Sequence, residues 1–199
     1  MRRWLSLLLL AHLGAAAPAL DPLLTSIDLA QKDLRSLKAE FVQRNRIKLF
    51  KQELVSRGRL HYQRQGSGPP QLLWEYLEPD PSSLLLQGKQ ATLRMAGRPP
   101  QVFDMERDAT MRAIFDELLL WLGNGSLRAA GTHYEMAPAG DKAAPAVALV
   151  PRSGTPLSRT FTRIELRVDP RTMLLKGILL VEKSGDEKEI VFTHMERKK

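Results

Sequence analysis

Three histidines, His61, His133 and His194, are the side chains of residues 20–199 best suited to metal binding or proton transfer. Each lies in a different predicted strand, and no two of them have the spacing of a metal-binding pair. The chain contains no cysteine that could complete such a site. We interpret the histidines as surface or structural residues, and we expect neither a metal ion nor a cofactor.

Other patterns lack the parts that catalysis requires. Gly66-Ser67-Gly68 has neither the lysine nor the helix start of a phosphate loop. Ser153-Gly154 is a turn without the flanking residues of a nucleophile elbow. Asp104, Glu106 and Asp108 precede a predicted helix, where carboxylates interact favourably with the helix dipole. The sequence therefore offers no catalytic residues, and we expect the protein not to be an enzyme.

The predicted helix over residues 108–122 is unusually apolar. Its apolar stripe consists of Met111, Ile114, Phe115, Leu118 and Leu122. Residues 118–122 are also apolar without interruption, which a helix with a single buried face does not need. Either both sides of this helix are covered by an ordinary core, or one side faces an apolar cavity that could hold acyl chains.

Alternating apolar and polar residues predict a β-rich domain around this helix. An amphipathic helix over 22–36 comes first, and Asp21-Pro22 is a suitable start for it. Strands are expected over about 37–51, 53–63, 72–77, 84–87, 91–95, 128–136, 145–151, 161–169, 174–183 and 187–196. Short strands at even spacing, interrupted by one helix, predict an antiparallel meander or open barrel with helices attached.

The N-terminus has the pattern of a signal peptide over residues 1–19. Arg2 and Arg3 precede a short apolar run from Leu5 to Leu13, and small residues follow over 15–19. A transmembrane anchor is the alternative, but the run is shorter than the roughly 20 residues that span a bilayer. We expect export, cleavage after Ala19, and one mature domain over residues 20–199 in the periplasm.

Composition restricts the partners of the exported chain. The formal charge of +8 becomes +6 when Arg2 and Arg3 are removed, so the mature domain is still basic. Export argues against nucleic acid, and the basic residues alternate with apolar ones as on a solvated sheet face. The absence of cysteine excludes disulfides, and it also excludes the lipid anchor of bacterial lipoproteins.

Four stretches resemble the periplasmic lipoprotein carriers, the LolA-like family. They are residues 37–43 (LKAEFVQ), 58–64 (GRLHYQR), 73–79 (LWEYLEP) and 86–89 (LQGK). The third stretch is close to the family's Phe-x-Trp-x-Tyr-x-x-Pro segment. The order and spacing of the stretches agree with the family, and residues 169–172 (DPRT) stand where the family has a late hairpin.

The resemblance implies an unclosed antiparallel β-barrel, with a helical lid over an apolar cavity that holds the acyl chains of lipoproteins. Leu72, Trp74 and Tyr76 would share the cavity-facing side of one strand. The lid would contribute Ile114, Phe115, Leu118, Leu119 and Leu122. Plain core packing is the alternative role for both groups.

The resemblance also implies a latch and partners. The family's lid-latching arginine corresponds to Arg64, although Gln65 to Gly68 intervene here before the usual proline. An exposed arginine at the end of a strand is the alternative. The implied partners are lipidated proteins, an inner-membrane lipoprotein-releasing transporter and an outer-membrane lipoprotein receptor, with the carrier itself a monomer.

Two other functions use the same fold. One is a non-transporting envelope interaction or sensor module, and the other is a carrier of another lipid or glycolipid. A sensor would be expected to have a second domain or a tether, and the sequence shows neither.

Overall fold

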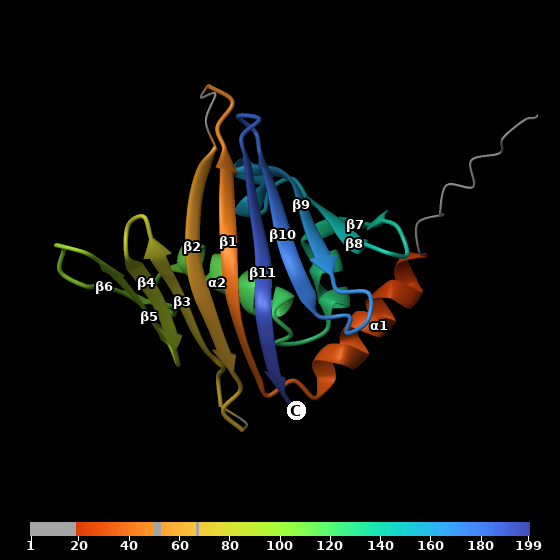
Figure 1. Cartoon of the computed structure of the whole chain (residues 1–199), viewed down its shortest axis with the longest axis horizontal. Coiled ribbons are helices and arrows are strands. Elements are labelled where there is room, and N and C mark those ends of the chain that lie inside the picture. The colour runs from red at the N-terminus through yellow and green to blue at the C-terminus, as the bar shows by residue number, and fades with distance from the viewer. Residues whose placement is uncertain (1–18, 50–52, 67) are drawn as a thin grey trace, which may run out of the picture.

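The computed structural model describes residues 19–49, 53–66 and 68–199, so the expected signal peptide lies outside the described residues except for Ala19. The described residues form one antiparallel sheet of 11 strands in the order β6-β5-β4-β3-β2-β1-β11-β10-β9-β8-β7 (Figure 1). The outermost strands, β6 and β7, do not pair, so the sheet is unclosed. The expected fold class is confirmed.

The elements follow one another along the chain with short connections. The helices are α1 (Leu20–Lys32), α2 (Ala109–Trp121) and the 3₁₀ turns η1 (Leu127–Thr132) and η2 (Leu157–Arg159). The first strands are β1 (Ser36–Arg46), β2 (Leu54–Gln63), β3 (Gln71–Glu78), β4 (Ser82–Gln87), β5 (Gln90–Met95) and β6 (Gln101–Asp104). The later strands are β7 (Tyr134–Gly140), β8 (Pro145–Pro151), β9 (Phe161–Val168), β10 (Leu175–Glu182) and β11 (Glu187–Lys198).

Two meanders make up the sheet. Strands β1 to β6 form one and β7 to β11 form the other, and they join where β1 pairs with β11 at the centre. The chain passes from the β6 edge to the β7 edge through α2 and η1. Figure 1 shows α2 behind the central strands, so this connection covers the inner face of the sheet.

Alternation along the strands decides which side chains enter the interior. On β1, Leu37, Ala39 and Phe41 are buried, whereas Lys38 and Glu40 are exposed. On β9, Ile164 and Leu166 are buried in the same way. The helix α1 adds Leu24 and Ile27 to this core from one end of the sheet. The prediction of half-buried strands is confirmed at these positions.

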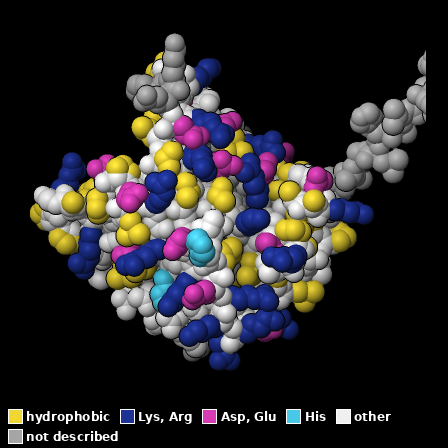
Figure 2. Space-filling model, in the orientation of Figure 1, with side chains coloured by type: hydrophobic (Ala, Val, Ile, Leu, Met, Phe, Trp, Pro, Cys, Tyr) yellow, Lys and Arg dark blue, Asp and Glu magenta, His cyan; other side chains and the backbone are white. Residues whose placement is uncertain are grey.

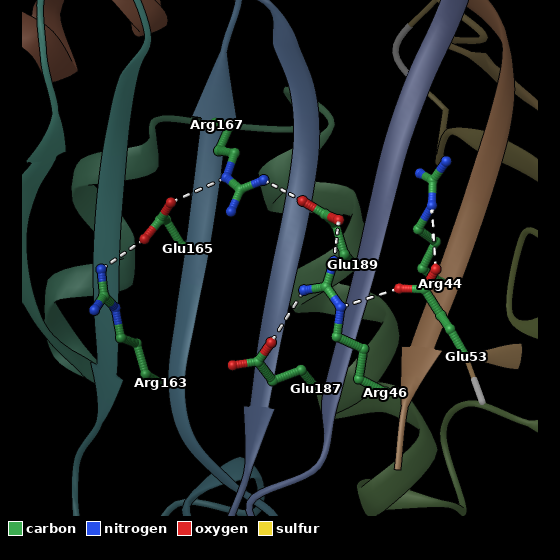
Figure 3. A network of polar contacts seen from close by, with 8 residues as sticks. All are labelled: Arg44, Arg46, Glu53, Arg163, Glu165, Arg167, Glu187 and Glu189. Atoms are coloured by element: carbon green, nitrogen blue, oxygen red, sulfur yellow. Dashed lines mark hydrogen bonds and ion pairs between the residues drawn. The ribbon is translucent and has the colours of Figure 1, made fainter. Parts of the chain in front are cut away.

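The outer face of the sheet carries the charges (Figure 2). A network of ion pairs crosses it from β9 to the residue just before β2 (Figure 3). Its members are Arg163, Glu165, Arg167, Glu187, Glu189, Arg46, Glu53 and Arg44. A single exposed ion pair contributes little to stability, but these pairs share their charges in one network, in which Glu165 and Glu189 are mostly covered. They keep the outer face hydrated, and the inner face is left to the apolar residues.

Several predicted elements need correction. The strand expected over 128–136 is wrong at its start, because η1 occupies Leu127–Thr132 and β7 begins at Tyr134. Ser126 caps this turn, and Asp28 on α1 accepts hydrogen bonds from Ser126 Oγ and Leu127 N. This contact spans about half the chain, so local alternation could not reveal it.

Element ends also differ from the sequence expectations. The helix α1 ends at Lys32 rather than at residue 36, and β1 ends at Arg46 rather than near residue 51. The edge strand β6 has four residues and was not expected at all. Among the described residues, no helix has both the length and the apolar character needed to span a bilayer.

Gly58 allows the aromatic residues of the core to approach β2 closely. It pairs with Phe41 on β1 and with Tyr76 on β3. The Phe41 ring centre lies 4.7 Å from that of Trp74 and 5.3 Å from that of Tyr76. A Cβ atom at Gly58 would lie 2.4 Å from the Phe41 ring and 2.0 Å from the Glu75 carbonyl oxygen. Because glycine has no side chain, the Phe41 ring can occupy the space that a Cβ atom at position 58 would take.

We predict that Gly58→Ala destabilises the protein by about 1–3 kcal/mol, because the methyl group must displace both a ring and a backbone carbonyl. Urea unfolding followed by circular dichroism measures this loss. Ser56→Ala, in the same strand, is the matched control and should unfold close to wild type. Equal stability of Gly58→Ala and wild type would contradict this account of the packing.

Candidate functional site

An apolar cavity of about 320 Å³ lies between α2 and the inner face of the sheet. Nearly all of its wall is hydrophobic, and the apolar side chains come from α2, η2 and strands on both halves of the sheet. They are Trp74, Tyr76, Leu84, Leu93, Ile114, Leu118, Trp121, Leu157, Phe161, Ile178, Leu180 and Ile190. The polar lining residues are Gln43, Ser82, Ser83 and Lys188. Close-packed protein interiors seldom leave an apolar space of this size.

The helix α2 separates its apolar residues onto two faces. Ile114, Leu118 and Trp121 recur at helical spacing and line the cavity. Phe115, Leu119 and Leu122 recur with the same spacing and belong to the packed core. Ile114 is 40% exposed, whereas Leu122 is 1% exposed. The helix is apolar around most of its circumference because it has a core on one side and a cavity on the other.

The ends of α2 are held by polar contacts. Asp108 caps the N-terminus, and its Oδ1 accepts a hydrogen bond of 2.9 Å from Met111 N. The buried Glu117 carboxylate contacts His133 Nδ1 at 2.9 Å. Burial, with the nearby Glu117 carboxylate, raises the pKa of Tyr134 far above its usual value, so its phenol stays neutral. These contacts tie the helix to the β7 side of the sheet.

The cavity wall on β3 is ordered by aromatic packing and by a short polar chain. Tyr76 Oη donates to Gln43 Oε1 at 2.7 Å, and Gln43 Nε2 donates to Asn45 Oδ1 at 3.0 Å. Burial raises the pKa of Tyr76, so its hydroxyl remains a donor. The Trp74 ring contacts the tilted ring of Phe41 and the edge-on ring of Phe192, with ring-centre distances of 4.7 and 6.0 Å.

Arg64, at the end of β2, contacts both main helices at their C-terminal ends. Its Nη1 donates to the Lys32 carbonyl at 3.0 Å, and Nη2 donates to the carbonyls of Gln31 and Gly123. Its Nε donates to Tyr62 Oη at 3.1 Å. The last carbonyls of a helix carry partial negative charge, which favours a cation there. The four residues after Arg64 do not keep its guanidinium from these carbonyls.

The structure divides the residues expected at the cavity into two groups. Trp74, Tyr76, Ile114 and Leu118 lie in the cavity wall. The other four lie in the packed core instead, and they are Leu72, Phe115, Leu119 and Leu122. Sequence alternation identifies the inner face of a strand, but it cannot show whether that face meets a neighbour or an empty space.

Most of the cavity wall was not expected from the sequence. Ile178, Leu180 and Ile190 line it from β10 and β11, and Leu84 and Leu93 line it from β4 and β5. The alternation of apolar and polar residues in β10 and β11 identifies their inner face, and it is the feature of the sequence that could have indicated these residues. Which inner residues surround the cavity depends on the position of α2 over the sheet.

One histidine, His133, lies apart from the other two. His133 follows η1, where it contacts Glu117, and is not in a strand. His61 and His194 both line a polar hollow on the outer face. There His194 Nδ1 contacts Glu40 Oε2 at 2.9 Å, and burial, with Lys38 and Lys198 nearby, lowers the pKa of His61. Within the part of the chain that the structure describes, no three metal-ligating side chains are grouped to hold an ion.

Comparisons with known proteins agree with this architecture. The sequence profile of the family described as "Outer membrane lipoprotein carrier protein LolA" matches residues 32–199. A chain of the Pseudomonas aeruginosa MucA/MucB complex matches with a TM-score of 0.54 and 15% identity, covering 89% of this chain and 56% of that one. A LolA superfamily protein from Nitrosomonas europaea matches with a TM-score of 0.45 and 14% identity, covering 92% of this chain and 95% of that one.

A crystal structure of MucB matches with a TM-score of 0.51 and 15% identity, covering 89% of this chain and 58% of that one. This chain therefore spans little more than half the length of the MucB chain. No curated protein matches the sequence. Identities of this size establish a shared fold and nothing finer.

The two faces of α2 lead to a stability prediction. Leu118→Glu should cost about 1 kcal/mol, because its carboxylate reaches water through the cavity. Leu119→Glu should cost more than about 3 kcal/mol, because the same carboxylate enters the core without a partner. Urea unfolding of the two variants beside wild type measures both losses. Equal losses would contradict the division of α2 into a cavity face and a core face.

Proposed function

This chain belongs to the outer membrane lipoprotein carrier protein family, and on that premise we propose that it is a periplasmic carrier of lipoproteins. It would hold the acyl chains of a lipoprotein in the cavity beneath α2 while the chains cross from the inner to the outer membrane. The partners would be an inner-membrane transporter that releases lipoproteins and an outer-membrane receptor that accepts them. The observation that carries the proposal is the apolar cavity itself.

Burial of methylene groups supplies the binding energy. Each methylene transferred from water to an apolar site contributes about 0.8 kcal/mol, so ten of them contribute about 8 kcal/mol before ordering costs. An acyl chain in the cavity would contact apolar side chains such as Trp74, Leu118 and Ile178, and the wall offers it few hydrogen-bonding groups. The affinity of such a site for a ligand depends more on the length of the ligand's apolar chain than on the arrangement of its polar groups.

Release and uptake require α2 to move, because this helix covers the inner face between the two sheet edges. Arg64 connects the end of α1 to Gly123, the second residue after the end of α2. We propose that this contact latches the empty carrier closed. Lysine has the charge of arginine but lacks the planar set of donors that reaches several carbonyls at once.

The proposal is tested by displacement of an environment-sensitive apolar dye from the purified protein. Saturable dye binding is expected, with competition by palmitate and none by butyrate. Leu118→Glu should abolish dye binding while the fold is kept, because a carboxylate would enter the cavity. Absence of saturable binding to the folded wild-type protein would contradict the carrier function.

The same fold occurs in a complex of two proteins, MucA and MucB. An interaction module that binds a protein partner is therefore the alternative function for this chain. Such a module would need no acyl ligand, so the displacement experiment separates the two functions.

We predict that Arg64→Leu loads a fluorescent lipoprotein as well as wild type or better, and delivers it poorly to the receptor. Loss of the latch removes about 1–3 kcal/mol of preference for the closed form, a shift of about 5- to 150-fold toward the open form. Arg64→Lys should have the same effect to a smaller degree. A transfer assay that follows loading and delivery separately measures both steps.

The matched control is Arg59→Leu, which removes an arginine of the same strand that pairs with Glu75 on the outer face. This variant should load and deliver like wild type. If Arg64→Leu also does both normally, Arg64 is only a strand-end residue and not a latch.

A further inference from the structure

One charged side chain lies among the residues that line the cavity, and it is Lys188. Its position follows from alternation along β11, where Ile190 and Phe192 are buried in the core. Lys188 has the same parity as these two residues, so the strand directs it to the inner face. A lysine at this position is unusual, because the rest of the wall supplies no charge to balance it.

The acidic neighbours of Lys188 are turned to the opposite face of the sheet. Glu187 pairs with Arg46, and Glu189 pairs with Arg167, both within the outer network (Figure 3). None of the ion pairs found among the described residues includes Lys188. The structure therefore places a half-buried lysine among the residues that line an apolar space, and no carboxylate of the described residues forms an ion pair with it.

Polar residues neighbour Lys188 on the adjacent strand β1. Asn45 lies directly opposite Lys188 in the β1–β11 register, and Gln43, two residues before Asn45, lies opposite Ile190. Tyr76 donates to Gln43, and Ser82 pairs with Tyr76 across β3 and β4. Gln43, Ser82 and Lys188 all line the cavity. The cavity thus has an almost wholly apolar wall, and Lys188 is the one charged residue that lines it.

From this arrangement we infer that the cavity binds single-chain amphiphiles with an acidic head group, either a carboxylate or a phosphate monoester. The chain would occupy the apolar body, and the head group would pair with the Lys188 ammonium. A charged hydrogen bond to an anion is stronger than one between neutral groups, and it strengthens further in surroundings of low polarity. The inference rests on the proposed function, because it uses the same acyl-binding cavity, and it adds free acidic amphiphiles to the acyl chains of lipoproteins.

The test compares three ligands of equal chain length in the dye-displacement assay at pH 8, and they are palmitate, hexadecyl phosphate and hexadecanol. Wild type should bind both acids at least about tenfold more tightly than the alcohol, as expected for one charge-assisted contact. Lys188→Met should lose this preference and keep its affinity for hexadecanol within about twofold. Lys188→Arg should retain the preference.

The control variant is Lys176→Met, which removes an exposed lysine of β10 and should bind all three ligands like wild type. Acetate and inorganic phosphate, which lack the chain, should not displace the dye. Equal affinities of wild type and Lys188→Met for the acids would overturn the head-group assignment and leave the carrier function standing. Failure of all three ligands to bind wild type would overturn both.

Discussion

The apolar inner face of an unclosed sheet has to be covered from water, and the arrangement of the helices in this structure depends on that requirement. Eleven antiparallel strands present one apolar face, and their two edges do not meet. One helix, α2, and the short turn η1 pass over this face from the β6 edge to the β7 edge. A single helix of 13 residues buries the centre of such a face but does not fill its width. The space that remains is the cavity between α2, β3, β10 and β11.

A second consequence concerns the ends of the helices. The helix α2 ends beneath the sheet, where its last carbonyl groups need donors. Gln31 Nε2 contacts the Trp121 carbonyl at 3.3 Å, and the Arg64 guanidinium reaches the carbonyls of Lys32 and Gly123. The C-terminal ends of two helices thus meet at one cation. In the proposed carrier, these are the polar contacts that opening of α2 would have to break.

Local periodicity predicted the strand-rich domain, the helix over residues 108–122 and the side of β3 that carries Trp74 and Tyr76. The unclosed sheet was expected from the family resemblance, because closure depends on contacts between distant strands. Local periodicity failed where distant contacts decide the outcome. Asp28 on α1 fixes the turn at Ser126 that replaced a predicted strand. Likewise, Leu118 and Leu119 are neighbours of equal hydrophobicity, and only the position of α2 over the sheet separates cavity from core.

Occupation of this cavity by an acyl chain is the central claim, and the tryptophans allow it to be measured directly. Two of the three tryptophans in the chain, Trp74 and Trp121, line the cavity, and the third, Trp4, lies in the expected signal peptide. A stearate brominated near the middle of its chain quenches tryptophan fluorescence only at contact distance. We predict saturable and nearly complete quenching of the mature protein at stoichiometric ligand, reversed by unlabelled stearate. Weak quenching that rises linearly with ligand concentration would contradict the account, because it would mean that the chain does not enter the cavity.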